Sequence, residues 1–193
     1  MSKSFIRIAG ADLETTGFHY DKDDKITEFC FDIHDFDLAT KTFTHRKTWG
    51  SLVNPERGIP QKVQDLTNIR PIDVALKPNF KHFAPGIEKL MNTVDIFVAH
   101  NFEFDGPFLH YEMTKAGYEL NTDCEPFCTM QAGRFAKPLG EVPKLTDLCW
   151  ALEVEFDDTV AHRADYDTSK MMECFIKGVK TGVFEPELLK GKL

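Results

Sequence analysis

Short runs in the first quarter of the chain are typical of β-strands, and the first is apolar enough to lie in the middle of a sheet. Three such runs are separated by polar turns. We expect strands from Phe5 to Leu13, from Ile26 to His34 and from Lys41 to Leu52. Because short links join them, the three strands are predicted to pair as an antiparallel meander.

The rest of the chain alternates between short apolar runs and stretches with helical spacing. Residues 95–100 form a continuous apolar run, as expected of a buried strand, and residues 102–116 follow as a helix ended by Gly117. Helical spacing over 79–91 is interrupted by Pro85, which predicts a broken or late-starting helix. The remaining predictions are a helical turn over 59–71 closed at Pro71, a short strand at 127–129, helices at 131–135, 144–152 and 164–179, and a turn at 185–189. Together these elements indicate an α/β fold with a mixed sheet flanked by helices.

Length and composition favour one intracellular domain spanning 1–193. Hydrophobic residues make up 42% of the 193, and no apolar segment resembles a signal or membrane span, so a cytoplasmic location without membrane contact is expected. The five cysteines lack paired spacing, which favours reduced thiols. A net charge of −8 argues against a broad basic face that coats nucleic acid.

Acidic residues gather in three separate stretches at element ends. The first is the run Asp12-Leu13-Glu14-Thr15-Thr16-Gly17, in which Asp12 and Glu14 share one face of a strand. The second contains Asp105 at the start of the 102–116 helix, and the third follows His162. Each has an ordinary structural explanation, because carboxylates also stabilise helix starts and a single D-x-E is a weak pattern.

Taken together, the three stretches resemble the DnaQ-like 3′–5′ exonucleases of the DEDDh type, within the ribonuclease H-like superfamily. The first stretch is similar to that family's first motif. Ala99-His100-Asn101 with Phe104-Asp105 is similar to the second, and His162-Arg163-Ala164 with Asp167 is similar to the third. The resemblance runs from about Ile6 to Ile176 and includes Leu66-Thr67-Asn68-Ile69, where the family often has Gly in place of Asn68.

The resemblance implies a metal-dependent exonuclease that releases nucleoside 5′-monophosphates from a 3′ end by a two-metal mechanism. Four carboxylates would hold two Mg²⁺ ions, with Mn²⁺ as a substitute, since hard cations prefer oxygen ligands. The implied metal ligands are Asp12, Glu14, Asp105 and Asp167. His162 would be the general base, because histidine ordinarily titrates close to working pH.

The same resemblance places substrate-binding residues around these carboxylates. Leu13 and Thr15 would contact the terminal nucleotide, and Phe18 and Phe104 would pack against bases, since aromatic stacking tolerates any sequence. His100 and Asn101 would line the pocket. Asp165 is the alternative to Asp167 as a metal ligand; the spacing from His162 favours Asp167. A tyrosine variant of the third motif would place Tyr where this chain has Arg163, so the histidine type fits better.

Several alternatives concern substrate and partner. Single-stranded DNA is the expected substrate, with an RNA-trimming activity as the alternative and a non-catalytic module that binds nucleic-acid ends as a weaker one. Polymerase association and a homodimer are both open. Only a short tail follows Val183, from which we expect a stand-alone enzyme at least as readily as a polymerase-tethered one.

Overall fold

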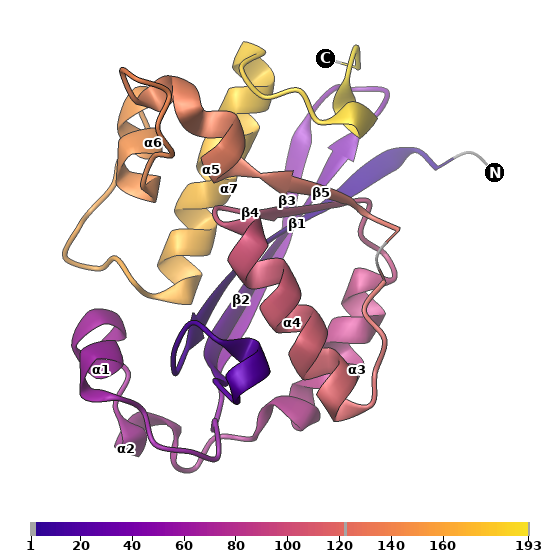
Figure 1. Ribbon diagram of the computed structural model, residues 1–193. Helices are drawn as coiled ribbons and strands as arrows, with labels where there is room; N and C mark the ends of the chain where they lie inside the picture. The colour runs from indigo at the N-terminus through magenta and orange to yellow at the C-terminus, as the bar shows by residue number, and fades with distance from the viewer. Residues whose placement is uncertain (1–2, 122, 193) are drawn as a thin grey trace.

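The computed structural model describes residues 3–121 and 123–192 and has a five-stranded mixed sheet at its centre (Figure 1). The strand order is β3-β2-β1-β4-β5. β1, β2 and β3 pair in antiparallel fashion, whereas β4 pairs with β1, and β5 with β4, in parallel. The strands are β1 (Phe5–Thr15), β2 (Ile26–Asp37), β3 (Phe43–Leu52), β4 (Ile96–Ala99) and β5 (Glu125–Cys128). The predicted α/β fold with an antiparallel meander and parallel strands is therefore confirmed.

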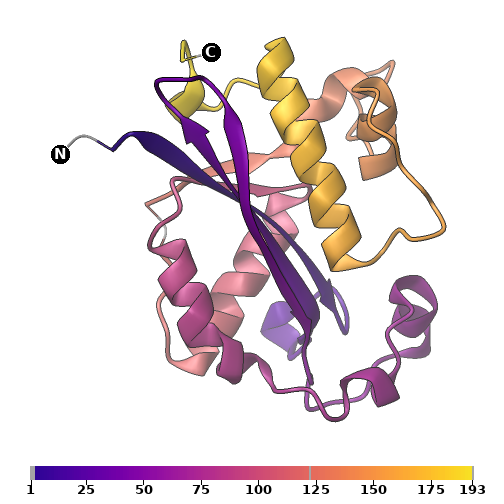
Figure 2. The ribbon, with the colours of Figure 1, turned by 180° about the vertical axis from the view of Figure 1, so that it is seen from behind.

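Helices cover both faces of this sheet (Figures 1 and 2). On one face lie α3 (Phe80–Met91) and α4 (Phe102–Ala116); on the other lie α6 (Leu145–Ala151) and α7 (Ala164–Thr181). The short elements are α1 (Gln61–Thr67), α2 (Pro71–Val74), α5 (Thr129–Ala132) and the 3₁₀ turns η1 (Tyr20–Lys22), η2 (Gly133–Ala136) and η3 (Glu187–Leu189). Asn68, which ends α1, has the left-handed backbone that the family's usual Gly would adopt easily (φ 56°).

The alternation of β1 determines where its acidic residues point. Ala9, Ala11 and Leu13 belong to the core beneath α3 and α4, while Ile6 and Ile8 belong to the core beneath α7. Since side chains alternate along a strand, Gly10, Asp12 and Glu14 continue the row that faces α7. A Cβ atom on Gly10 would lie 2.5 Å from Met172 Cγ, so the glycine lets α7 approach β1 closely.

Three sequence-based boundaries are wrong. α3 is continuous through Pro85, because Phe80, Ala84, Ile87 and Met91 are buried on one face and this burial outweighs the single backbone hydrogen bond that proline removes. Pro71 begins α2 instead of closing a helix, as suits a residue without an N–H at a first helical position. The last strand starts at Glu125 and stops before Thr129, which begins α5.

Two further predictions concern membrane-spanning segments and the cysteines. Among the described residues, no helix has both the length and the apolar character that crossing a bilayer demands. All five cysteines are free thiols, and Cys30, Cys149 and Cys174 are buried.

Candidate active site

Four carboxylates meet at the carboxyl ends of two parallel strands. β1 and β4 pair in parallel register, with Ile8 opposite Ile96, so the chain leaves both strands at the same end of the sheet. Asp12 and Glu14 lie at that end of β1, and Asp105 lies near the start of α4, which follows β4. Asp167 lies in the first turn of α7, which packs across β1.

The electrostatics of this group show how closely the acids are gathered. Burial, together with the negative charges of Asp105, Glu14 and Asp167, raises the pKa of Asp12 well above its ordinary value. Burial and the same kind of repulsion raise the pKa of Glu14 to about 8, which Arg163 partly opposes. Burial also raises the pKa of Asp105 to about 7, although backbone N–H groups, including that of Leu13, oppose the rise. A bound cation would relieve this repulsion.

His162 joins the cluster from the loop before α7. Ligand atoms of Glu14, His162 and Asp167 all lie within 4.8 Å of one another. The backbone N–H of His162 donates to Asp167 Oδ2 (2.9 Å), and His162 has a left-handed backbone with φ 62°. This conformation is uncommon for a non-glycine residue and costs free energy, which the surrounding structure has to offset. The imidazole is exposed, so it lies at the surface of the cluster where substrate and solvent have access.

One atom of the cluster is suited to bind a cation. Asp167 Oδ1 is buried and has no hydrogen-bond partner among the described residues. A buried carboxylate oxygen without a partner is costly unless a ligand or ion satisfies it. Carboxylate oxygens suit Mg²⁺ or Mn²⁺, so the donor set fits the hard divalent cations implied by the sequence.

Sequence reasoning missed one acidic residue next to the cluster, Glu28. It lies directly opposite Glu14 on β2 and is only 5% exposed. Glu28 accepts hydrogen bonds from Arg163 Nη2 (3.1 Å) and from the backbone N–H of Ala164 (3.1 Å). It thereby fixes the start of α7 and the residue after His162. A charged residue within the apolar run of β2 was the available signal.

The predicted stacking residues lie side by side at the surface. Phe18 is 76% exposed and meets Phe104 edge to face, with ring centroids 6.1 Å apart. The Leu13 side chain is buried in the core beneath α4, which leaves its backbone for any contact with substrate. The hydroxyl of Thr15 donates to the carbonyl of Gly17. The substrate-binding roles of these residues remain predictions.

His100 and Asn101 both have hydrogen-bond partners within the fold. His100 Nδ1 is 3.0 Å from Thr129 Oγ1, and its Nε2 is 3.2 Å from the carbonyl of Pro143. Burial lowers the pKa of His100 to about 4, so the imidazole is neutral at ordinary pH. The carbonyl of Asn101 accepts from the N–H groups of Phe104 and Asp105, which positions the start of α4. A pocket-lining role for either residue remains a prediction.

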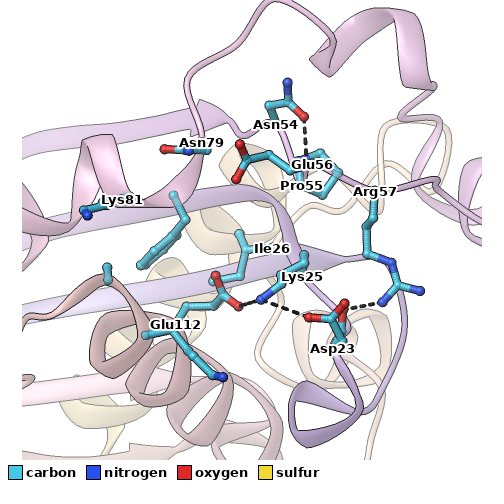
Figure 3. Close-up of a pocket in the computed structure, with 13 residues that line it drawn as sticks. Asp23, Lys25, Ile26, Asn54, Pro55, Glu56, Arg57, Asn79, Lys81 and Glu112 are labelled. Atoms are coloured by element: carbon cyan, nitrogen blue, oxygen red, sulfur yellow. Dashed lines mark hydrogen bonds and ion pairs between the residues drawn. The ribbon is translucent and has the colours of Figure 1, made fainter.

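A separate cavity of about 370 Å³ lies beside the turn that follows the first motif (Figure 3). Lys25 donates to Glu112 (3.1 Å) and lies 3.5 Å from Asp23, while Arg57 donates to the Asp23 carbonyl. None of the four clustered carboxylates lines this cavity. Its acids and bases largely neutralise one another, in contrast to the unneutralised cluster at the end of β1.

The mixed sheet and the carboxylate cluster agree with the exonuclease family that the sequence motifs resemble. The sequence matches the RNase_T exonuclease family over residues 10–175, and the chain belongs to that family. It is 34% identical over 161 residues to the 3′-5′ exonuclease DinG of Bacillus subtilis, covering 83% of this chain and 16% of that protein. It is 31% identical over 168 residues to the PolC-type DNA polymerase III of Mycoplasma genitalium, a match that covers 85% of this chain and 11% of that protein. The chain thus spans less than a fifth of these relatives.

Solved structures share the fold at lower identity. The nuclease domain of 3′hExo, a DEDDh family member bound to rAMP, has a TM-score of 0.72 at 15% identity, covering 95% of this chain and 96% of that one. Exonuclease X in complex with 5′ overhanging duplex DNA has a TM-score of 0.67 at 22% identity, covering 96% and 98%. These likenesses confirm the mixed-sheet architecture.

Proposed function

We propose that this chain is a metal-dependent 3′–5′ exonuclease that removes nucleoside 5′-monophosphates from single-stranded DNA. The observation that carries the proposal is the cluster of Glu14, His162 and Asp167, whose ligand atoms lie within 4.8 Å and whose Asp167 Oδ1 lacks a partner among the described residues. Three further features support it: the adjacent carboxylates of Asp12 and Asp105, the membership in an exonuclease family, and relatives named as 3′-5′ exonucleases.

The residues of the site have three roles: metal binding, proton transfer and base stacking. Asp12, Glu14, Asp105 and Asp167 would hold two Mg²⁺ ions. Bound divalent ions supply Lewis acidity, which lowers the pKa of water and offsets charge on the scissile phosphate. His162 accepts the proton of the attacking water, and its exposed position beside Asp167 suits that role. Phe18 and Phe104 stack against the terminal bases.

The DNA preference rests on the relatives. A PolC-type DNA polymerase III relative and a solved structure of exonuclease X with DNA both favour deoxyribonucleotide substrates. The neighbour bound to rAMP keeps RNA as the second candidate. Polymerase association and self-association remain predictions.

The proposal is tested with a 5′-labelled oligonucleotide in Mg²⁺, as matched DNA and RNA versions side by side. We expect stepwise shortening from the 3′ end, faster on DNA. Asp167→Ala and His162→Ala should abolish it, with folding monitored by circular dichroism.

Asp165→Ala is the matched control, because this exposed carboxylate lies in the same first turn of α7 but outside the cluster. We expect it to retain activity. Unchanged cleavage in Asp167→Ala would reject the carboxylate assignment, and binding of oligonucleotide without cleavage at any Mg²⁺ concentration would reject the enzymatic function.

A further inference from the structure

A second group of potential metal ligands lies on the same face of the sheet, beside the acidic cluster. Ligand atoms of Asp32, His34 and His45 all lie within 4.8 Å of one another. His34 Nε2 is 3.0 Å from Asp32 Oδ2, and His45 Nε2 is 3.0 Å from Asp32 Oδ1. Asp12 of the acidic cluster lies opposite Cys30, which is two residues, or about 7 Å in an extended strand, from Asp32 along β2. The two groups of ligands are neighbours that share no residue.

An irregularity in strand pairing assembles this group. Asp32 pairs with Thr48 and His34 pairs with His45, which leaves Arg46 as an extra residue on β3. Residues three apart on a regular strand point to opposite faces. Because of the bulge, His45 and Thr48 both reach Asp32, whereas Arg46 pairs with Asp35 instead. Bulges of this kind re-aim side chains and are common at functional sites.

The donors have the chemistry and spacing of a site for a borderline-soft transition metal. Two imidazole nitrogens and one carboxylate oxygen form a common three-ligand set for Zn²⁺. Ligands 2.0–2.1 Å from a tetrahedral ion are about 3.3 Å apart. The two histidines contact different oxygens of Asp32 at 3.0 Å, and one ligand atom from each of the three residues lies within 4.8 Å of the others, so side-chain rotation has to bring them closer around an ion. Both histidines direct the same nitrogen, Nε2, toward Asp32.

The surroundings supply support and access. Thr48 Oγ1 donates to Asp32 Oδ1 (3.0 Å), which is the kind of outer contact that orients metal-binding carboxylates. The His45 side chain is 53% exposed while that of Asp32 is 8% exposed. A cavity of about 310 Å³ adjoins the three residues and is bordered by Glu173 of α7. An ion could therefore enter from solvent and keep a fourth position for water.

We propose that Asp32, His34 and His45 form a second metal site that binds Zn²⁺ or a similar divalent transition metal and links β3 to β2. The site differs from the acidic cluster in ligand type: nitrogen donors select zinc-like ions, whereas the four carboxylates select Mg²⁺. Occupancy holds the edge strand β3, which has no further strand outside it in the described sheet, against its neighbour.

The test is calorimetric titration of the purified protein with Zn²⁺ in excess Mg²⁺, which occupies the carboxylate cluster. We expect one equivalent of zinc to bind, with shifts in the imidazole ¹⁵N signals of His34 and His45. His45→Gln should weaken binding at least about tenfold, because even outer contacts of metal ligands are worth 10–100-fold in affinity. Since His45 is exposed, this variant should fold and keep full Mg²⁺-dependent nuclease activity.

His162→Gln is the matched control, since it removes the imidazole of the other cluster. It should bind zinc as the unmodified protein does. The proposal is overturned if no zinc is taken up in excess Mg²⁺, if His45→Gln binds it unchanged, or if His162→Gln is the variant that loses it. Asp32→Asn is a second variant that tests the same site, and it should also weaken zinc binding.

Discussion

Asp12 and Asp32 are on neighbouring strands and face the same helix, α7, yet their pKa values move in opposite directions. Burial raises the pKa of Asp12, and four further carboxylates add to the rise. Burial also acts to raise the pKa of Asp32, but hydrogen bonds and charge from His34, with a further bond from Thr48, reverse it and leave the pKa lowered. Burial acts to raise the pKa of both carboxylates; the neighbours add to that effect at Asp12 and reverse it at Asp32.

This contrast distinguishes a site that requires an ion from one that can exist without it. The carboxylates around Asp12 repel one another, and Asp167 Oδ1 has no partner among the described residues, so the folded protein is strained there without a cation. The group around Asp32 is already hydrogen-bonded. Removing one charge should therefore have opposite effects on stability at the two positions.

The largest expected effect comes from neutralising each aspartate in turn. In Mg²⁺, Asp12→Asn should lose more than about 100-fold of nuclease activity, since even outer contacts of metal ligands cost 10–100-fold. Asp32→Asn should keep its activity. In chelator at about pH 8, Asp12→Asn should raise the melting temperature because it removes repulsion, whereas Asp32→Asn should lower it by several degrees.

Nuclease assays and thermal unfolding of the two variants under identical conditions provide the measurement. Equal shifts in melting temperature at the two positions would contradict the comparison. A large loss of activity in Asp32→Asn would show that the histidine-containing group belongs to the catalytic machinery.

The sequence predicted the fold well because its signals are local. The apolar run of β1 is readable without tertiary information, and the alternation of side chains along any strand places Asp12 and Glu14 on one face. The prediction of a helix broken at Pro85 was wrong for a tertiary reason. Phe80, Ala84 and Ile87 are buried on one face of α3, and this burial keeps both halves in a single helix.

Only those residues of the site that belong to a sequence motif could be predicted. Family resemblance identified His162 and Asp167 from their spacing, and the structure places both beside Glu14. Glu28 was missed because its importance depends on Arg163, which is 135 residues away. The group around Asp32 was also missed, since only the bulge on β3 brings His45 and Thr48 to the same face.

A smaller effect is expected at Glu28, which lies opposite Glu14 beside the carboxylate cluster without belonging to it. Glu28→Gln weakens the bonds to Arg163 and to the N–H of Ala164 that position the start of α7. We expect about a tenfold loss of nuclease activity, in the range found for outer contacts of metal sites. Steady-state kinetics at several Mg²⁺ concentrations should show a higher Mg²⁺ requirement.

Glu173→Gln is the matched control for Glu28→Gln. Glu173 pairs with Lys170 on the exposed surface of α7, and such pairs contribute little. We expect its Mg²⁺-supported activity to be unchanged. If Glu28→Gln leaves the Mg²⁺ requirement unaltered, Glu28 has no positioning role.

The smallest expected effect, a pH dependence of stability, compares the clusters without any substitution. The pKa values of Glu14 and Asp105 are raised to about 8 and about 7, so the folded state binds protons more tightly than the unfolded state. The associated stability is complete at low pH and is lost as pH rises through these values. In chelator, the melting temperature should therefore fall by a few degrees as the pH rises from about 5 to about 8, and it should level off above that range. Adding Mg²⁺ or substituting Asp12→Asn should make the melting temperature less dependent on pH, whereas Asp32→Asn should leave that dependence unchanged. If Mg²⁺ does not alter the pH dependence, the titrating groups lie outside the carboxylate cluster.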